Sequence, residues 1–165
     1  MTDLKQLLLA EPPLSLAVAE SLTAGRVQSR LAAISGASAF FLGGITAYSL
    51  DQKVKHLGVN RAAAAAVNSV SAEVAEQMAR GVCSLFGADI GLSTTGYAEP
   101  LESAGVQQPF AWWAIAARAP NRKDFTLRHG YVECQGASRI DAQIIVSEAA
   151  ISELEAFLRE RRGQG

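Results

Sequence analysis

The sequence predicts an α/β fold, a three-layer α/β/α sandwich around a mixed, mainly parallel sheet of five strands. Apolar runs without polar alternation, typical of strands covered on both faces, alternate with segments of helical periodicity. Late in the chain two such runs, 110–117 and 125–134, follow each other with only a short connection. That succession predicts one antiparallel pairing in an otherwise parallel sheet.

Length and composition suit one globular domain over residues 1–165. Hydrophobic residues make up 49% and charged residues 19%, which excludes disordered and fibrous classes. The net charge of −1 predicts no nucleic-acid partner, and no apolar run reaches membrane length. Cys83 and Cys134 lack metal-ligand spacing and read as buried free thiols. We therefore expect a soluble, cytoplasmic protein without a membrane partner.

The first third of the chain predicts a helix, a strand and a second helix. An amphipathic helix over residues 4–10 is ended by two prolines, which a helix interior excludes. A strand over 14–19 then leads directly into a helix, since apolar residues recur at i, i+4 and i+7 from Val27. We expect this helix to end near Gly36, because glycine suits a helix C-terminus.

Residues 45–67 predict a strand and two short helical segments. The strand covers 45–49, where β-favouring residues follow a pair of glycines. A helical turn over 51–56 carries Lys53, and the alanine-rich run 62–67 favours a further helix.

A longer helix is predicted from Ser71, which has the character of an N-cap. Val74, Met78 and Leu85 form its expected apolar face, and Gly87 follows its expected end.

The remaining elements follow from the same signals: strands over 90–94, 110–117 and 125–134, a polar mobile loop over 101–109, and a last helix beginning at Ser138. A serine followed three residues later by an acid marks that helix start. Its expected apolar face is carried by Ile144, Ile151, Leu154 and Leu158.

Three loops of chemical interest each follow a predicted strand directly, over 20–25, 48–53 and 94–100. In open α/β sheets, ligands bind beyond the carboxyl ends of the strands. We therefore expect the three loops to converge on one site.

Ser21 stands at or next to the N-cap of the helix that follows the first strand. An N-cap, a phosphate contact and a nucleophile are all open to a serine there. A triad with histidine is disfavoured, because His56 and His129 lie outside the three loops. Lys53 is the best-placed alternative base, since a shielded lysine loses its proton more easily, although an exposed lysine is the commoner case.

Tyr48 and Arg139 are further candidates. Tyr48 is equally compatible with a half-buried residue at a strand end. Arg139 lies in the first turn of the last helix, where a cation is unfavourable, which indicates a partner nearby or a solvated arginine.

Several short motifs recur in a familiar order and spacing over nearly the whole chain: Ala19–Gly25, Gly36–Phe41, Tyr48–Lys53, Leu57–Val59, Val70–Ser71 and Thr95–Pro100. In these motifs the sequence resembles the CinA C-terminal domain family, of the competence/damage-inducible proteins. The resemblance implies the α/β/α fold and a nicotinamide mononucleotide deamidase activity used in recycling NAD. Such an enzyme hydrolyses a linear amide to nicotinate mononucleotide and ammonia, with no metal or other cofactor.

The resemblance also implies roles for individual residues. Ser21 matches the nucleophile, Lys53 the base, and Tyr48 the tyrosine that opens the second motif. The implied substrate-binding residues are Thr23, Gly25, Thr95, Gly96, Ala98 and Arg139, with backbone amides near Thr23 and Gly25 stabilising the oxyanion. The expected partner is a small nucleotide-like amide, and the protein is expected to form a homo-oligomer.

Other functions remain open at this point. Leu50, Glu99, Trp112 and Gln143 depart from the family pattern. They would suit an inactive or substrate-shifted member that binds a pyridine nucleotide or a small anion. An assembly surface at Trp112 and Trp113 is a third alternative, although neighbours on a strand face opposite sides, so one of them should be buried.

Overall fold

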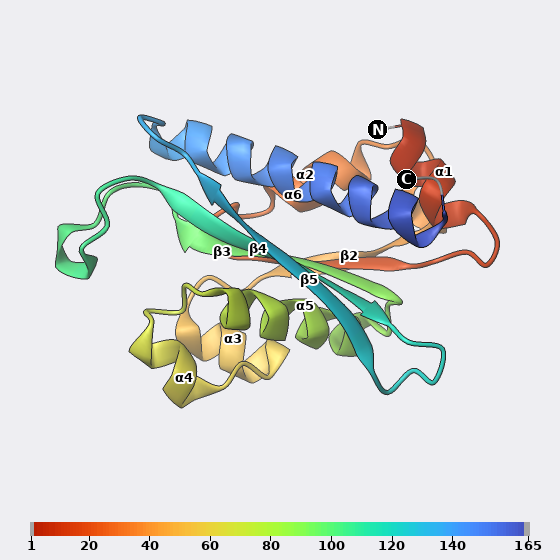
Figure 1. Ribbon diagram of the computed structural model, residues 1–165, viewed down its shortest axis with the longest axis horizontal. Coiled ribbons are helices and arrows are strands. Elements are labelled where there is room, and N and C mark those ends of the chain that lie inside the picture. The colour runs from red at the N-terminus through yellow and green to blue at the C-terminus, as the bar shows by residue number, and fades with distance from the viewer. Residues whose placement is uncertain (1, 164–165) are drawn as a thin grey trace.

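The computed structural model describes residues 2–163 and shows an α/β fold with a five-stranded mixed sheet (Figure 1). The strands are β1 (Leu16–Glu20), β2 (Phe41–Thr46), β3 (Ile90–Tyr97), β4 (Phe110–Arg118) and β5 (Phe125–Glu133). The helices are α1 (Thr2–Leu9), α2 (Arg26–Ala32), α3 (Leu50–Leu57), α4 (Arg61–Ala66), α5 (Ala72–Phe86) and α6 (Arg139–Arg161). The ends of the predicted domain 1–165 lie outside the described residues.

The sheet has the order β2-β1-β3-β4-β5, and its pairings correct the prediction of a mainly parallel sheet. Strand β1 pairs in parallel with β2 and β3, whereas β3–β4 and β4–β5 are antiparallel. A parallel β4 would need a crossover, usually through a helix. Residues 98–109 contain only the short 3-10 helix Glu102–Ala104, so the chain turns back beside β3 instead.

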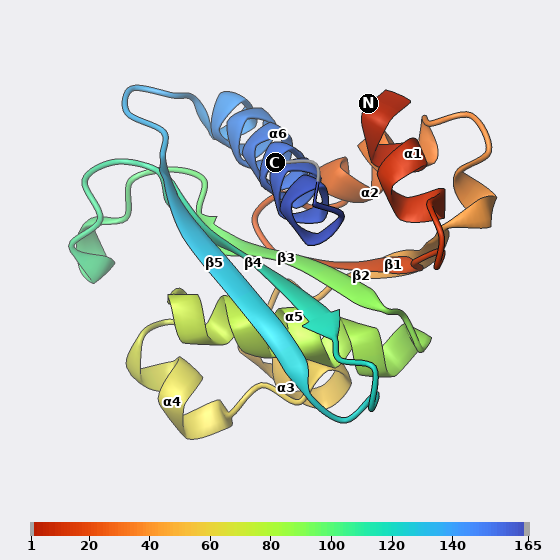
Figure 2. The same cartoon turned by 45° about the vertical axis from the view of Figure 1, so that its right-hand side comes forward.

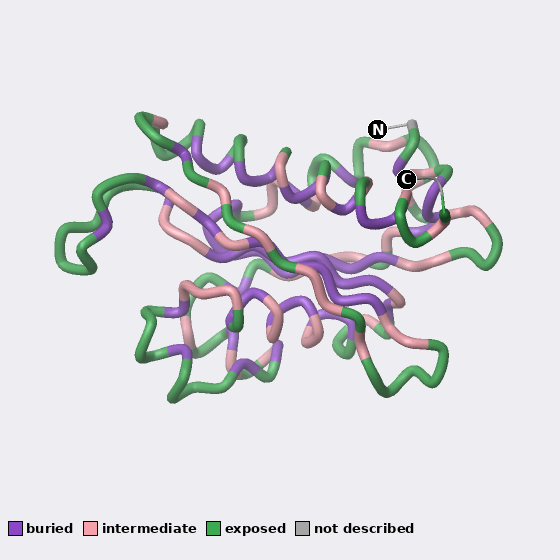
Figure 3. Tube along the Cα trace, in the orientation of Figure 1, coloured by how far each residue is buried: buried purple, intermediate pink, exposed green. Residues whose placement is uncertain are grey.

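Helices cover both faces of the sheet, as the three-layer prediction requires. Figures 1 and 2 show α1, α2 and α6 on one face and α3, α4 and α5 on the other. The burial colouring in Figure 3 follows from this arrangement, because the central strands are buried along most of their length. All of β1 is buried, which explains the apolar run Leu16–Ala19 that precedes the buried Glu20.

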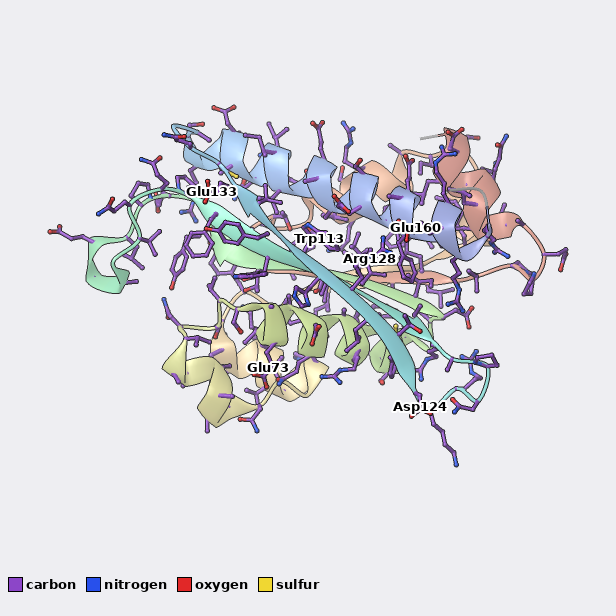
Figure 4. The ribbon with its side chains drawn as sticks, in the orientation of Figure 1. Glu73, Trp113, Asp124, Arg128, Glu133 and Glu160 are labelled. Atoms are coloured by element: carbon purple, nitrogen blue, oxygen red, sulfur yellow. The ribbon has the colours of Figure 1, made fainter. Side chains whose placement is uncertain are left out.

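The core on the α6 side contains Trp113, which is 5% exposed, whereas Trp112 is half-buried on the opposite side of β4. A Cβ at Gly130 would lie 2.3 Å from the Trp113 ring, so this indole requires a glycine on β5. Figure 4 shows Arg128 of β5 beside Glu160 of α6, with which it forms an ion pair.

Strand β2 begins earlier than predicted, because it runs through the glycine pair instead of following it. The register with β1 shifts between Leu16 and Ala17, beside Gly43, which has φ 136°. A Cβ at Gly44 would lie 2.6 Å from the Gln28 side chain of α2. The glycines therefore permit a bulge and close helix packing within a strand.

Helix α5 has the N-cap and the C-cap that the sequence predicts. Ser71 is its N-cap, accepting a hydrogen bond from Val74 N at 3.1 Å, and Gly87 is its left-handed C-cap. Leu85 was wrongly placed on the apolar face: it is 47% exposed, since the buried stripe ends on Val82 and Cys83.

Two further details of the sequence interpretation are corrected near α6. Ile144 is 38% exposed, because the buried face of α6 passes through Ala142, Gln143 and Val146 at this point. Residues 101–109, expected to be an irregular loop, contain a short helix and a bridge between Leu101 and Val106. In residues 2–163, no helix combines the length and the apolar character needed to cross a membrane.

Candidate active site

A cavity of about 490 Å³ lies where the parallel strands β1, β2 and β3 end. Its lining includes residues from all three predicted loops, among them Ser21, Lys53 and Thr95. The convergence expected from the sequence is thus confirmed. A volume of this size is typical of small-molecule sites.

Ser21 is not the N-cap of the following helix. The turn 21–25 separates it from α2, whose N-cap is Gly25. The helix start is already occupied by the fully buried Glu20, whose carboxylate accepts hydrogen bonds from the backbone N–H groups of Gly25, Val27 and Gln28. This carboxylate takes the place that an anionic ligand would need, and it anchors the turn that carries Ser21.

Ser21 and Lys53, far apart in sequence, meet inside the cavity. Lys53 Nζ lies 2.9 Å from Ser21 Oγ, within hydrogen-bond distance. The same nitrogen donates to the carbonyl oxygens of Ala47 at 2.9 Å and Tyr48 at 3.0 Å. Lys53 lies in the first turn of α3, and its side chain reaches back toward the helix N-terminus to make these contacts.

Burial lowers the pKa of Lys53 from its ordinary value of 10.5 to about 8, because the charged ammonium loses solvation. The residue is 2% exposed. When protonated, its three N–H groups match three oxygen acceptors. When neutral, two N–H groups suffice for the two carbonyl oxygens, which leaves the lone pair for the hydroxyl proton of Ser21.

Arg139 and Tyr48 lie together at the cavity, with Glu99 as a third member. Arg139 Nη1 donates to Glu99 Oε1 at 2.5 Å, and Nη2 donates to the Tyr48 hydroxyl at 2.7 Å. The partner expected from the position of Arg139 is therefore present. Tyr48 is 53% exposed, and the backbone carbonyl of this residue, not its side chain, contacts Lys53.

The remaining predicted binding residues fall into two groups. Thr95, Gly96 and Ala98 line the cavity, whereas Thr23 and Gly25 are absent from its lining within residues 2–163. The Thr23 hydroxyl lies 2.7 Å from that of Thr94 and is fully buried. The N–H of Gly25 donates to the Glu20 carboxylate and is therefore not available to an oxyanion. Any oxyanion contact would have to come from other N–H groups of the turn that carries Ser21.

Asn68 and Ser69 also line the cavity, and the sequence interpretation missed them. Both adopt left-handed backbone conformations, with φ 49° and 62°. Such strain in residues other than glycine is concentrated at functional sites. Asn68 Nδ2 donates to the Tyr97 hydroxyl at 2.9 Å, and Ser69 O accepts from Thr95 Oγ1 at 2.7 Å. The sequence signal for this turn was the Asn-Ser pair that follows the alanine-rich helix, since asparagine tolerates the left-handed conformation.

Other reactive groups lie away from this cavity. His129 Nδ1 lies 2.8 Å from Glu76 Oε1, and Cys83 and Cys134 are buried free thiols, as predicted. No group of three His, Cys, Asp or Glu side chains in residues 2–163 could hold a metal ion.

Curated relatives align with this chain over most of its length or over about half of it. A CinA-like protein from Chlorobium limicola is 42% identical over 154 residues, which cover 93% of this chain and 35% of that protein. A CinA-like protein from Chlorobaculum tepidum is 50% identical over 93 residues, covering 56% of this chain and 22% of that protein. The chain therefore spans about a third or less of the length of these relatives.

Solved structures show the same fold. A competence-damaged protein (CinA) superfamily structure from Klebsiella pneumoniae matches with a TM-score of 0.86 and 25% identity, covering 96% of this chain and 95% of that one. A competence/damage-inducible protein from Agrobacterium tumefaciens matches with a TM-score of 0.79 and 25% identity, covering 93% and 94%. A family model described as the CinA C-terminal domain matches residues 2–158. With nearly all of its length matched in this way, the chain belongs to the CinA C-terminal domain family.

Proposed function

We propose that this protein is an amidohydrolase in which Ser21 is the nucleophile and Lys53 the general base. The observation that supports the proposal most directly is the 2.9 Å separation of Lys53 Nζ and Ser21 Oγ. A serine hydroxyl is a weak nucleophile until a neighbouring base takes its proton. A lysine with a pKa of about 8 is partly neutral near neutral pH and can act as that base.

The proposed reaction begins when Ser21 Oγ attacks the carbonyl carbon of a carboxamide and its proton passes to Lys53 Nζ. The resulting tetrahedral intermediate expels ammonia, which takes the proton from Lys53, and a serine ester remains. Water then attacks the ester carbonyl and gives a proton to Lys53, which returns it to Ser21 Oγ. The carboxylic acid formed loses its proton and the released ammonia takes one up, so each turnover consumes one water and yields a carboxylate and an ammonium ion.

A backbone N–H group near the nucleophile completes the proposed chemistry. In residues 2–163, the N–H groups of Leu22 and Thr23 have no hydrogen-bond acceptor within the chain, whereas Ser21 N donates to Thr94 O at 3.0 Å. Leu22 lines the cavity beside Ser21. We assign the N–H group of Leu22 to the oxyanion that forms on the carboxamide oxygen.

The substrate class proposed is a nicotinamide-type carboxamide, with nicotinamide mononucleotide as the first compound to test. Its hydrolysis to nicotinate mononucleotide is followed as ammonia release. We expect Ser21→Ala to lose at least about 100-fold in kcat, because the substitution removes the hydroxyl that Lys53 Nζ contacts. Ser29→Ala removes an exposed hydroxyl from α2 and should leave the rate unchanged. Equal turnover by wild type and Ser21→Ala would refute the assignment of the nucleophile.

A second candidate function is binding of a pyridine nucleotide or small anion without turnover. The ion pair between Glu99 and Arg139 favours this candidate, because the resemblance implies that Arg139 binds the substrate and here it already binds Glu99. Calorimetric binding of the nucleotide without any ammonia release would support this candidate. A cytoplasmic location and a homo-oligomeric state belong to the proposal as well, and light scattering on purified protein tests the second.

A further inference from the structure

The charges that line the cavity are few and unequally available. Among the described lining residues, Lys53 and Arg139 are the only basic side chains, and Glu99 is the only acidic one. Lys53 is 2% exposed, with its Nζ held by Ser21 and two carbonyl oxygens. Arg139 is therefore the one lining cation that an anionic group of a ligand could meet.

Arg139 already has a partner within the chain at each of its terminal nitrogens. Nη1 donates to Glu99 Oε1 at 2.5 Å, and Nη2 donates to the Tyr48 hydroxyl at 2.7 Å. Glu99 is placed for this contact by the segment that follows β3, and Arg139 is the first residue of α6. A ligand phosphate would have to displace Glu99 and then remain close to its negative charge.

Neutral hydrogen-bonding groups supply much of the rest of the polar lining: Ser49, Asn68, Ser69, Thr95 and Tyr97. Hydroxyl, phenol and amide groups suit the hydroxyls of a sugar. They provide no charge to balance a phosphate. The polar surface of the cavity thus matches a nucleoside better than a nucleotide.

We propose that Glu99 is a specificity-determining residue: by holding Arg139, it makes this cavity select carboxamides without a phosphate over their phosphorylated counterparts. The inference rests on the proposed amidohydrolase function for its kinetic test, but its binding test is independent of turnover. It predicts that removing the charge of Glu99 releases Arg139 for a phosphate.

The expected effect is moderate because the ion pair is open to solvent. The side chains of Arg139 and Glu99 are 44% and 59% exposed. Exposed pairs contribute up to about 1 kcal/mol, which corresponds to a change of about fivefold in relative affinity.

The experiment compares nicotinamide mononucleotide with the nucleoside obtained by removing its phosphate. The two compounds differ only in the group under test. Wild type should have a kcat/KM for the nucleotide no higher than that for the nucleoside. Glu99→Gln should shift the ratio about fivefold toward the nucleotide, and adding Arg139→Gln should abolish this gain.

Glu102→Gln is the matched control. Glu102 is exposed, lies in the same loop and is absent from the cavity lining within residues 2–163. Its substitution removes the same charge without releasing Arg139, so the ratio should not change. An equal shift in Glu102→Gln would show a general charge effect and overturn the proposal, as would a wild-type preference for the nucleotide.

Calorimetry in a Ser21→Ala background separates this inference from the proposed function. If wild type cleaves neither compound but Glu99→Gln still shifts the ratio of dissociation constants toward the nucleotide, the proposed function fails and the inference stands. If wild type cleaves both and Glu99→Gln leaves the ratio unchanged, the inference fails and the function stands. Absence of binding by both compounds would overturn both.

Discussion

The burial of Lys53 should make the stability of this protein depend on pH in a way that can be measured without any substrate. In the unfolded chain this lysine has its ordinary pKa of 10.5, whereas in the folded protein desolvation lowers the pKa to about 8. Between these values the unfolded state binds more protons than the folded state. The free energy of unfolding should therefore rise as pH increases through this window.

The magnitude follows from the two pKa values. Below pH 8 the folded protein carries the full cost of a buried ammonium, and above pH 10.5 the cost is gone. From about pH 7 to about pH 10, the wild type should gain about 2.5 kcal/mol of stability relative to Lys53→Met, in which nothing titrates at this position. Groups that titrate in both proteins cancel in the difference.

Urea unfolding of wild type and Lys53→Met across this pH range measures the effect. Lys55→Met is a suitable control, because it makes the same substitution at an exposed position of the same helix. Its difference from wild type should stay constant with pH. A wild-type to Lys53→Met difference that is also flat would refute the burial argument, and with it the physical basis for Lys53 as a base.

Three further outcomes are expected. If Lys53 acts as the base, kcat/KM for the amide should fall about tenfold per pH unit below pH 8 and level off above it, whereas a profile flat down to pH 6 would contradict the role. Glu20→Gln should lower the free energy of unfolding by about 2–3 kcal/mol, because the amide has only one acceptor oxygen for the three backbone N–H groups that the carboxylate accepts. An unchanged urea unfolding curve would contradict this. Burial raises the pKa of Cys83 to about 12, so iodoacetamide should modify this thiol only after unfolding, and mass spectrometry of the native protein would reveal any exception.

Much of the fold could be predicted from local patterns. The buried strand β1 was visible as an apolar run, and helix α5 was marked at both ends by Ser71 and Gly87. The predicted bounds of β2 were too late in the chain, because its pair of glycines was interpreted as a break before the strand. Only the close contact of Gly44 with Gln28 shows why glycine is tolerated within the strand. The antiparallel pairing of β4 with β3 was also missed, because the sequence of residues 98–109 does not indicate on which course the chain returns to the sheet.

The candidate site was predictable as a set of loops but not as a geometry. Topology placed Ser21 and Lys53 at the same edge of the sheet, since parallel strands present their carboxyl ends together. The left-handed pair Asn68 and Ser69 escaped notice because single-residue conformations leave a weak trace in sequence. The sequence analysis gave Glu20 no role beyond the first position of the loop 20–25, whereas the structure shows its carboxylate at the start of α2.

The sequence by itself determined the alternation of helices and strands and the chemistry available at the strand ends, because periodicity and residue type act locally. The tertiary structure alone decided that an amine and a hydroxyl lie 2.9 Å apart, that the amine is dehydrated, and that Arg139 is held by Glu99. These properties depend on distances between segments remote in the chain and on the exclusion of water, which only folding creates.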